Sequence, residues 1–174
     1  MRPARVDREE RGFTLIELMI AVVIIGVLAA IAVPFFLREA RKTKGDAEVM
    51  AMFTEVSVKQ DRYKGEAGSY LAVPTCPTTP SAQLQSIAAC TSSASWLALG
   101  LQSPTPQLRC SYAVTIGAAG VNPSPPAGFT LPTSPANGWY FIVATCNMDG
   151  SSTINSQYLQ SSLDSTVQKV NEGN

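Results

Sequence analysis

An uninterrupted apolar run near the N-terminus constrains this chain more than any other feature. Residues 18–37 are 20 consecutive residues without a charged side chain. An α-helix needs about 20 such residues to cross a hydrocarbon layer that is roughly 30 Å thick. One acid, Glu17, stands at the start of the run, where burying its carboxylate in lipid costs at least ~2.5 kcal/mol. The run predicts a membrane-spanning helix over residues 13–37, and the acid predicts a functional role for Glu17.

A short charged segment, residues 1–12, precedes the run. Its charged side chains are Arg2, Arg5, Asp7, Arg8, Glu9, Glu10 and Arg11. Basic residues before a spanning helix favour a cytoplasmic N-terminus. An ordinary secretory signal is cleaved at small residues after its apolar run, and Ala29, Ala30 and Ala32 offer such a site. Here the run continues directly into a charged helical pattern, which argues against that alternative.

The six residues Gly-Phe-Thr-Leu-Ile-Glu at positions 12–17 resemble the cleavage and methylation motif of type IV prepilins and type II secretion pseudopilins. The resemblance is specific over residues 11–42 and only general beyond them. It implies that residues 1–12 are a leader peptide and that prepilin peptidase cuts between Gly12 and Phe13. It also implies that the same enzyme methylates the new amine of Phe13.

By the same resemblance, Glu17 is the fifth residue of the mature chain, where the family has its glutamate, and we expect it to act in filament assembly. Cleavage would place a cation on Phe13, four residues before Glu17, and residues four apart share a helix face. The two charges are predicted to pair within one subunit or between neighbouring subunits, so that Glu17 sets the register of assembly. The alternative is a carboxylate that is merely solvated at headgroup level. Gly26 and Pro34 fall where the family places a helix-weakening glycine and proline, so a break or bend is expected there.

Composition excludes several classes of function. The chain has 174 residues, 13 basic and 13 acidic side chains and no histidine. Histidine-based acid–base catalysis and histidine ligation of zinc are therefore excluded. Lys and Arg do not form the clusters that phosphate backbones need, so no direct nucleic-acid binding is expected. The sequence contains neither a phosphate-binding glycine loop nor a nucleophile elbow. We therefore expect that the protein is not an enzyme and that it binds no cofactor and no metal.

Four cysteines follow the apolar run and predict disulfides. If the leader is cytoplasmic, they lie outside the cytoplasm, where disulfides persist. Four cysteines allow three pairings. We favour Cys76–Cys90, which closes a local loop, and Cys110–Cys146, which joins two strand-like segments. A zinc ion held by all four thiolates is the alternative, but no Cys-x-x-Cys spacing supports it.

Residues 38–66 have the pattern of an amphipathic helix. One mostly apolar stripe is formed by Val49, Phe53, Val56, Gln60 and Tyr63. Mixed charges cover the other face, as in a solvated helix. The helix is expected to extend from about Phe13 to about Gly65, with Gly65 and Gly68 as stop signals. The basic residues just after the apolar run either contact lipid headgroups or acidic neighbours, or are simple solvated surface; they are Arg38, Arg41, Lys42 and Lys44.

Residues 67–174 predict a C-terminal globular head with a small antiparallel sheet of three or four strands, which gives an α+β fold. Strands are expected at 108–116, 139–146 and 154–160, with a turn at 147–152. Loops are expected at 74–83, 103–107 and 117–138, a short helix or strand at 96–101, and a loosely packed tail at 161–174.

Other features of the head leave alternatives open. The aromatic residues Trp96, Trp139, Tyr140 and Phe141 favour sheet core over an exposed adhesive patch. The oxygen-bearing side chains that alternate over residues 147–155 favour a plain hairpin turn over a calcium loop, because they include one carboxylate. The Ser/Thr/Pro-rich loops are either plain exposed loops or carriers of O-linked sugar.

These patterns predict a structural subunit, a major or minor pilin, of a bacterial type IV pilus. The resemblance implies that its partners are itself and other pilins, prepilin peptidase, the inner-membrane assembly machinery and, before extraction, the membrane. It implies an inner-membrane precursor that moves to an extracellular pilus or a periplasmic pseudopilus. A type II secretion pseudopilin is the main alternative, and a membrane-tethered binding module that never assembles is the other.

Overall fold

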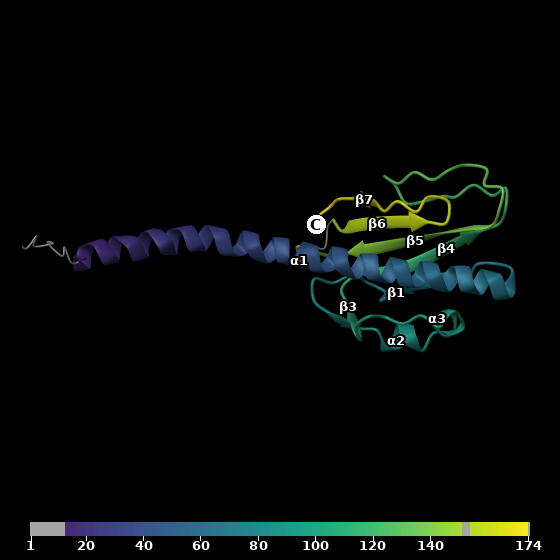
Figure 1. Cartoon of the computed structure of the whole chain (residues 1–174), viewed down its shortest axis with the longest axis horizontal. Coiled ribbons are helices and arrows are strands. Elements are labelled where there is room, and N and C mark those ends of the chain that lie inside the picture. Colours follow the sequence, from purple (N-terminus) through teal and green to yellow (C-terminus); the bar gives the residue numbers. More distant parts are fainter. Residues whose placement is uncertain (1–12, 151–153, 174) are drawn as a thin grey trace, which may run out of the picture. The chain divides into compact units, whose positions relative to one another are not determined.

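The computed structural model describes residues 13–150 and 154–173. The fold is α+β, with one long N-terminal helix, α1 (Leu15–Ala67), followed by a small antiparallel sheet (Figure 1). The chain divides into two units, Met1–Leu37 and Arg38–Asn174. The leader residues 1–12, including Gly12 of the predicted cleavage site, lie outside the described residues.

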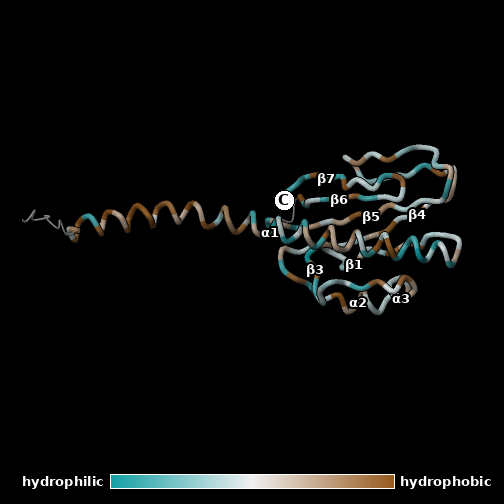
Figure 2. Tube along the Cα trace, in the orientation of Figure 1, coloured by the Kyte–Doolittle hydropathy of each residue, from teal (hydrophilic) through white to brown (hydrophobic). Residues whose placement is uncertain are grey.

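In the first unit, the described part of the chain consists of Phe13, Thr14 and the N-terminal half of α1. All side chains from Phe13 to Leu37 are exposed, and this stretch is predominantly hydrophobic (Figure 2). Gly26 and Pro34 both lie inside α1, so the helix is not broken at either residue, and a bend there stays a prediction. Proline removes one N–H donor, and glycine costs roughly 1 kcal/mol of helix stability relative to alanine. The helix continues through both residues because regular apolar turns precede and follow each of them.

The second unit contains more regular structure than the sequence predicted. Its sheet has five strands in the order β1-β4-β5-β6-β7, all antiparallel, and β2 and β3 form a separate pair. The strands are β1 (Val73–Cys76), β2 (Gln85–Ser86), β3 (Gln107–Leu108), β4 (Ser111–Gly117), β5 (Trp139–Cys146), β6 (Ser156–Ser161) and β7 (Gln168–Val170). Two short helices, α2 (Ala88–Thr91) and α3 (Ala94–Leu99), lie between β2 and β3.

Two predictions about the head were wrong. Strand β1 lies where a loop was expected; it is an edge strand, and an edge position tolerates Pro74 because its missing N–H takes no ladder bond. Strand β7 lies in the tail that was expected to pack loosely. It forms because Gln157, Tyr158 and other β6 residues offer it a free strand edge.

The helical stripe packs against one face of the sheet, the inner face. Val49, Met52, Phe53 and Val56 of α1 are at most 1% exposed and belong to one cluster with sheet residues such as Ile142. Burial of this kind contributes about 25 cal/mol per Å² of apolar surface removed from water.

Gln60 is a polar residue in this apolar stripe, and it is fully buried. Its side-chain amide donates to the Leu71 carbonyl at 2.6 Å and accepts from the Leu71 N–H at 3.0 Å. Both polar groups of the amide are therefore paired, which removes the cost of burying them. This pair also holds the chain that leaves α1 back against the helix.

The connection between β4 and β5, residues 118–138, covers part of the outer face of the sheet, and we call it the strap. Phe129 of the strap joins Trp139, Phe141 and Leu159 in a second buried cluster. The Trp139 indole N–H donates to the Val121 carbonyl at 2.8 Å. The segment was predicted as a loop, and the structure shows that it contributes its own small core.

The large aromatic residues of the head are buried. Trp96, Trp139, Tyr140 and Phe141 are each between 2% and 4% exposed. This excludes the exposed adhesive patch that was the alternative. Trp96 lies on α3, so residues 96–101 begin as helix, and it packs in the inner cluster rather than in the sheet itself.

Candidate functional site

The N-terminal motif is organised around a reciprocal pair, Thr14 and Glu17. The Glu17 carboxylate accepts from both the Thr14 N–H and the Thr14 hydroxyl at 2.9 Å, and the Thr14 hydroxyl accepts from the Glu17 N–H at 3.3 Å. The Thr14 carbonyl accepts the first helical bond, from the Leu18 N–H. This is a capping box, which satisfies donors that the first turn of a helix otherwise leaves unpaired.

The capping box changes the expected geometry of Phe13 and Glu17. Phe13 and Thr14 precede α1, so in this chain the two residues are not four apart on a helix face. Thr14 adopts the capping position because its hydroxyl and N–H find a partner in Glu17. Our sequence interpretation missed Thr14, although the Thr-x-x-Glu spacing at 14–17 is the signature of such a cap.

The apolar side chains of residues 13–37 are exposed, including the rings of Phe35 and Phe36, which contact each other edge to face. Exposed fractions include 84% for Phe13, 71% for Ile31 and 70% for Phe36. By length and composition α1 is able to cross a membrane, and no residue of its most apolar stretch is buried within the structure. A continuous apolar surface of this size requires lipid or other apolar helices around it.

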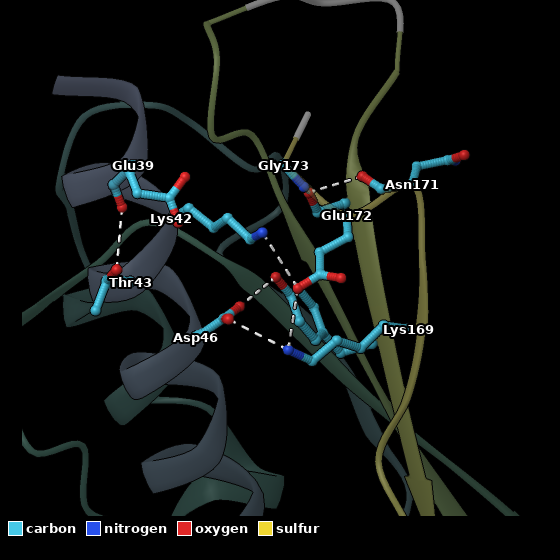
Figure 3. A network of polar contacts seen from close by, with 10 residues as sticks. Glu39, Lys42, Thr43, Asp46, Lys169, Asn171, Glu172 and Gly173 are labelled. Atoms are coloured by element: carbon cyan, nitrogen blue, oxygen red, sulfur yellow. Dashed lines mark hydrogen bonds and ion pairs between the residues drawn. The ribbon is translucent and has the colours of Figure 1, made fainter. Parts of the chain in front are cut away.

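In the second unit, Asp46 of α1 anchors the C-terminal strands to the helix. Its carboxylate accepts from the Tyr158 hydroxyl on β6 at 2.6 Å and pairs with Lys169 of β7 at 3.2 Å. The Glu172 carboxylate lies 3.4 Å from both the Lys169 and the Lys42 ammonium nitrogens (Figure 3). Because Lys42 belongs to α1, the network contacts the helix at a second residue. One of the basic residues that follow the apolar run, Lys42, therefore has an internal partner.

The Asp46 network also affects proton affinities. Burial and the hydrogen bond to Asp46 raise the pKa of Tyr158. Burial opposes the charged form of Lys169, but contacts with Asp46 and Glu172 outweigh it and raise the pKa of Lys169. Both groups therefore hold their protons more tightly in the folded chain than they do in water.

Glu48, two residues further along α1, anchors β4 and the two residues before it. Its carboxylate accepts from the Arg109 and Cys110 N–H groups, each at 3.0 Å, and from the Tyr112 hydroxyl at 3.1 Å. Burial and the charge of Glu48 raise the pKa of Tyr112. Asp46 and Glu48 together fix the head on its helix, and neither was predicted from the sequence.

Both disulfides that we favoured are formed. Cys76 of β1 joins Cys90 of α2, with the Cα atoms 5.6 Å apart. Cys110, just before β4, joins Cys146 at the end of β5, with the Cα atoms 4.2 Å apart. Because Cys110 also donates its N–H to Glu48, the second disulfide and the carboxylate fix the same point of the sheet.

The turn considered for calcium has other contacts. The Asn147 side-chain oxygen accepts from the Gly150 N–H at 2.7 Å, as in a plain turn. Residues 151–153 of this turn lie outside the described residues. Within 13–150 and 154–173, no group of three or more His, Cys, Asp and Glu side chains is placed to hold a metal ion.

Comparison with known proteins assigns the N-terminal segment. Residues 7–33 match the family described as the prokaryotic N-terminal methylation motif. The chain is 46% identical over 69 residues to the type IV major pilin protein PilA of Myxococcus xanthus. It is 41% identical over 63 residues to the type IV wide pilus major component PilA4 of Thermus thermophilus.

In its N-terminal segment the chain is type IV pilin-like. It is also 34% identical over 80 residues to the type II secretion system core protein G of Dickeya chrysanthemi. The matched regions cover 36%, 36% and 42% of this pilin-like chain and 31%, 47% and 52% of the Myxococcus, Thermus and Dickeya relatives. The chain thus spans about a third to a half of the length of these relatives. No solved structure matches it.

Proposed function

We propose that this protein is a structural subunit, a major or minor pilin, of a bacterial type IV pilus, and not an enzyme. The observation that carries the proposal is that the methylation motif lies at the start of an apolar helix whose side chains are all exposed over residues 15–37. The precursor waits in the inner membrane with its N-terminus in the cytoplasm. Prepilin peptidase removes residues 1–12 and methylates Phe13, and the assembly machinery then draws the subunit out of the bilayer.

The physical basis of extraction is an exchange of one apolar environment for another. In the membrane, lipid surrounds residues 13–37; in the filament, the same helix of neighbouring subunits replaces the lipid. Helices in lipid gain little from the hydrophobic effect on association, so packing and polar contacts decide the outcome. The filament core is built from this helix, and the heads form the outer surface.

Glu17 supplies the polar contact that decides register. Before cleavage, Thr14 provides two donors to its carboxylate, which lowers the cost of keeping a charged group in the membrane. After cleavage, the methylated amine of Phe13 is a cation one residue from Thr14, and the Glu17 of an adjoining subunit is its partner. Pairing of two charges away from water is strong only when the geometry is satisfied, and this selects one register.

A type II secretion pseudopilin is the second candidate, because the Dickeya relative carries the name of a secretion-system core protein. Both candidates share the anchor and the processing step. They differ in where the assembled chain accumulates. A pilin is recovered in filaments sheared from the cell surface, whereas a pseudopilin stays with the cell envelope.

The test combines shearing with a substitution at Glu17. Quantitative immunoblots of sheared and membrane fractions are expected to show the wild-type chain in the sheared fraction. Glu17→Ala is expected to be processed and to remain in the membrane, while the matched control Glu39→Ala, an exposed carboxylate on the same helix, assembles normally. Normal assembly of the processed Glu17→Ala chain would refute the role of Glu17. Wild-type chain confined to the envelope would favour the pseudopilin.

A further inference from the structure

The outer face of the sheet carries a hollow of about 410 Å³ beside the strap. Its floor includes Ser111, Ala113 and Thr115 of β4 and Thr145 of β5, and one wall includes Pro125 and Pro126 of the strap. Successive residues of a strand point to opposite faces. Strand β5 also contributes Phe141 and Val143 to the lining, whereas the lining residues of β4 are small or hydroxyl-bearing. The hollow exists because these small side chains leave space that the strap encloses on one side.

The chemistry of the lining selects an uncharged ligand. The described residues that line the hollow include no charged side chain, so it offers no counter-charge to an anion, a cation or a metal ion. Hydroxyl groups from β4 and β5 stand beside the C–H surfaces of the two prolines. Such a mixture of a few hydrogen-bonding groups with apolar walls is typical of sites for small polar ligands.

The backbone of β4, β5 and β6 in the floor is not available to a peptide, although Thr75 of the edge strand β1 also lines the hollow. Strands β4, β5 and β6 each have a neighbour on both sides, so their N–H and C=O groups already serve the sheet. A peptide that binds a sheet does so by adding a strand to a free edge. At this place the side-chain hydroxyls are what a ligand meets, and a ligand that is itself rich in hydroxyls is the best match.

Ser111 provides an independent indication of a ligand. Its side chain is 2% exposed, and its Oγ has no hydrogen-bond partner within the described part of the chain. Buried hydroxyl groups are nearly always paired, because leaving one unpaired costs the full loss of its hydration. Ser111 also lines the hollow, so a ligand hydroxyl that reaches the floor brings the partner that Ser111 lacks.

We propose that the hollow on the outer face of the sheet binds a neutral saccharide of one or two sugar units. The sugar hydroxyls bond to the side chains of Ser111, Thr115 and Thr145. One C–H face of the ring packs against Pro125 and Pro126. This site lies within the head and does not depend on filament formation, so it stands or fails separately from the proposed function.

The test is saturation-transfer NMR on the full-length protein in a detergent without a sugar headgroup. Glucose, galactose and N-acetylglucosamine are the three probes, each at millimolar concentration. The variant Thr115→Val/Thr145→Val removes two hydroxyls and keeps the branched shape of both side chains. Its matched control, Thr54→Val/Thr133→Val, removes two exposed hydroxyls that are outside the lining. Circular dichroism verifies that both variants are folded.

Wild type and control are expected to bind at least one probe with the same Kd. The Thr115→Val/Thr145→Val variant is expected to raise that Kd about tenfold or more, as the loss of two neutral hydrogen bonds does. Two results would overturn the proposal. One is no saturation transfer from any of the three sugars, and the other is equal binding by the variant and the wild type, which would place the sugar elsewhere.

Discussion

Replacing Glu48 by alanine tests most sharply how the head is held on its helix. The substitution removes the acceptor for two backbone N–H groups and one tyrosine hydroxyl. Cys110 is fully buried and Tyr112 is 3% exposed, and in the folded chain the Glu48 carboxylate is the acceptor for the Cys110 N–H and the Tyr112 hydroxyl. Each buried donor left unpaired costs about 1–3 kcal/mol. We therefore expect Glu48→Ala to lower the free energy of unfolding by about 4 kcal/mol.

Glu48→Gln separates the charge from the hydrogen bonds. One carboxylate oxygen, Oε1, makes contacts with all three donors, whereas Oε2 contacts the Arg109 N–H alone. A glutamine carbonyl at the Oε1 position keeps all three partners but makes neutral bonds, which are about half as strong as charge-assisted ones. We expect this variant to lose about 1.5 kcal/mol, well below the loss in Glu48→Ala.

The assay is equilibrium urea unfolding of the full chain in detergent micelles, followed by tryptophan fluorescence. The chain has 2 tryptophans, Trp96 and Trp139, and both are buried in the head, so the signal reports the head alone. Glu39→Ala, an exposed carboxylate on the same helix, is the control and should change stability by less than about 0.5 kcal/mol. A Glu48→Ala loss as small as that of the control would refute the anchoring role of Glu48.

Three further predictions follow from the same contacts. Removing the Cys110–Cys146 disulfide, which spans 36 residues, should lower the free energy of unfolding by about 3.8 kcal/mol in the same urea assay; an unchanged midpoint would contradict this. Gly117→Ala should lower Tm, because the added methyl overlaps the ring of Trp139, which is 3% exposed, and overpacking typically costs about 1–3 kcal/mol; an unchanged Tm would show that the ring moves freely. Burial and the Asp46 contact raise the pKa of Tyr158, so its stabilisation should be complete below the unfolded pKa of about 10 and be lost as pH rises above it. The difference in phenolate absorbance between the wild type and Tyr158→Phe isolates the titration of Tyr158. This titration should occur at higher pH in the folded protein than in the unfolded chain, and titration near pH 10 in the folded protein would contradict the shift.

The long helix and the Cys76–Cys90 disulfide could be predicted because their signals are local. An apolar run of sufficient length predicts a helix whatever follows it, and the Cys76–Cys90 pairing closes a short loop. The Thr14–Glu17 cap was equally available from its spacing, but we considered Glu17 only as a charge in a membrane. Local rules are sufficient for the cap and for the Cys76–Cys90 disulfide, because the interacting residues are three and fourteen positions apart.

The carboxylates that anchor the head could not be predicted in the same way. Asp46 and Glu48 lie among many charges on residues 38–66, a pattern typical of a solvated helix face. Their partners are 61 to 123 residues away in sequence, and no local pattern specifies those distances. Strand β7 was missed for a related reason: its short polar sequence has little strand propensity, and it is held by the edge of β6 and by Lys169.

The most direct test of the central claim, that this is a processed filament subunit, is the N-terminal state of the chain in cells. Intact mass and N-terminal sequencing should be measured on chain from sheared surface filaments and, separately, from membranes. We predict that chain in the sheared fraction begins at methylated Phe13 and has all four cysteines oxidised. A chain that keeps residues 1–12 in cells with active prepilin peptidase would contradict the account.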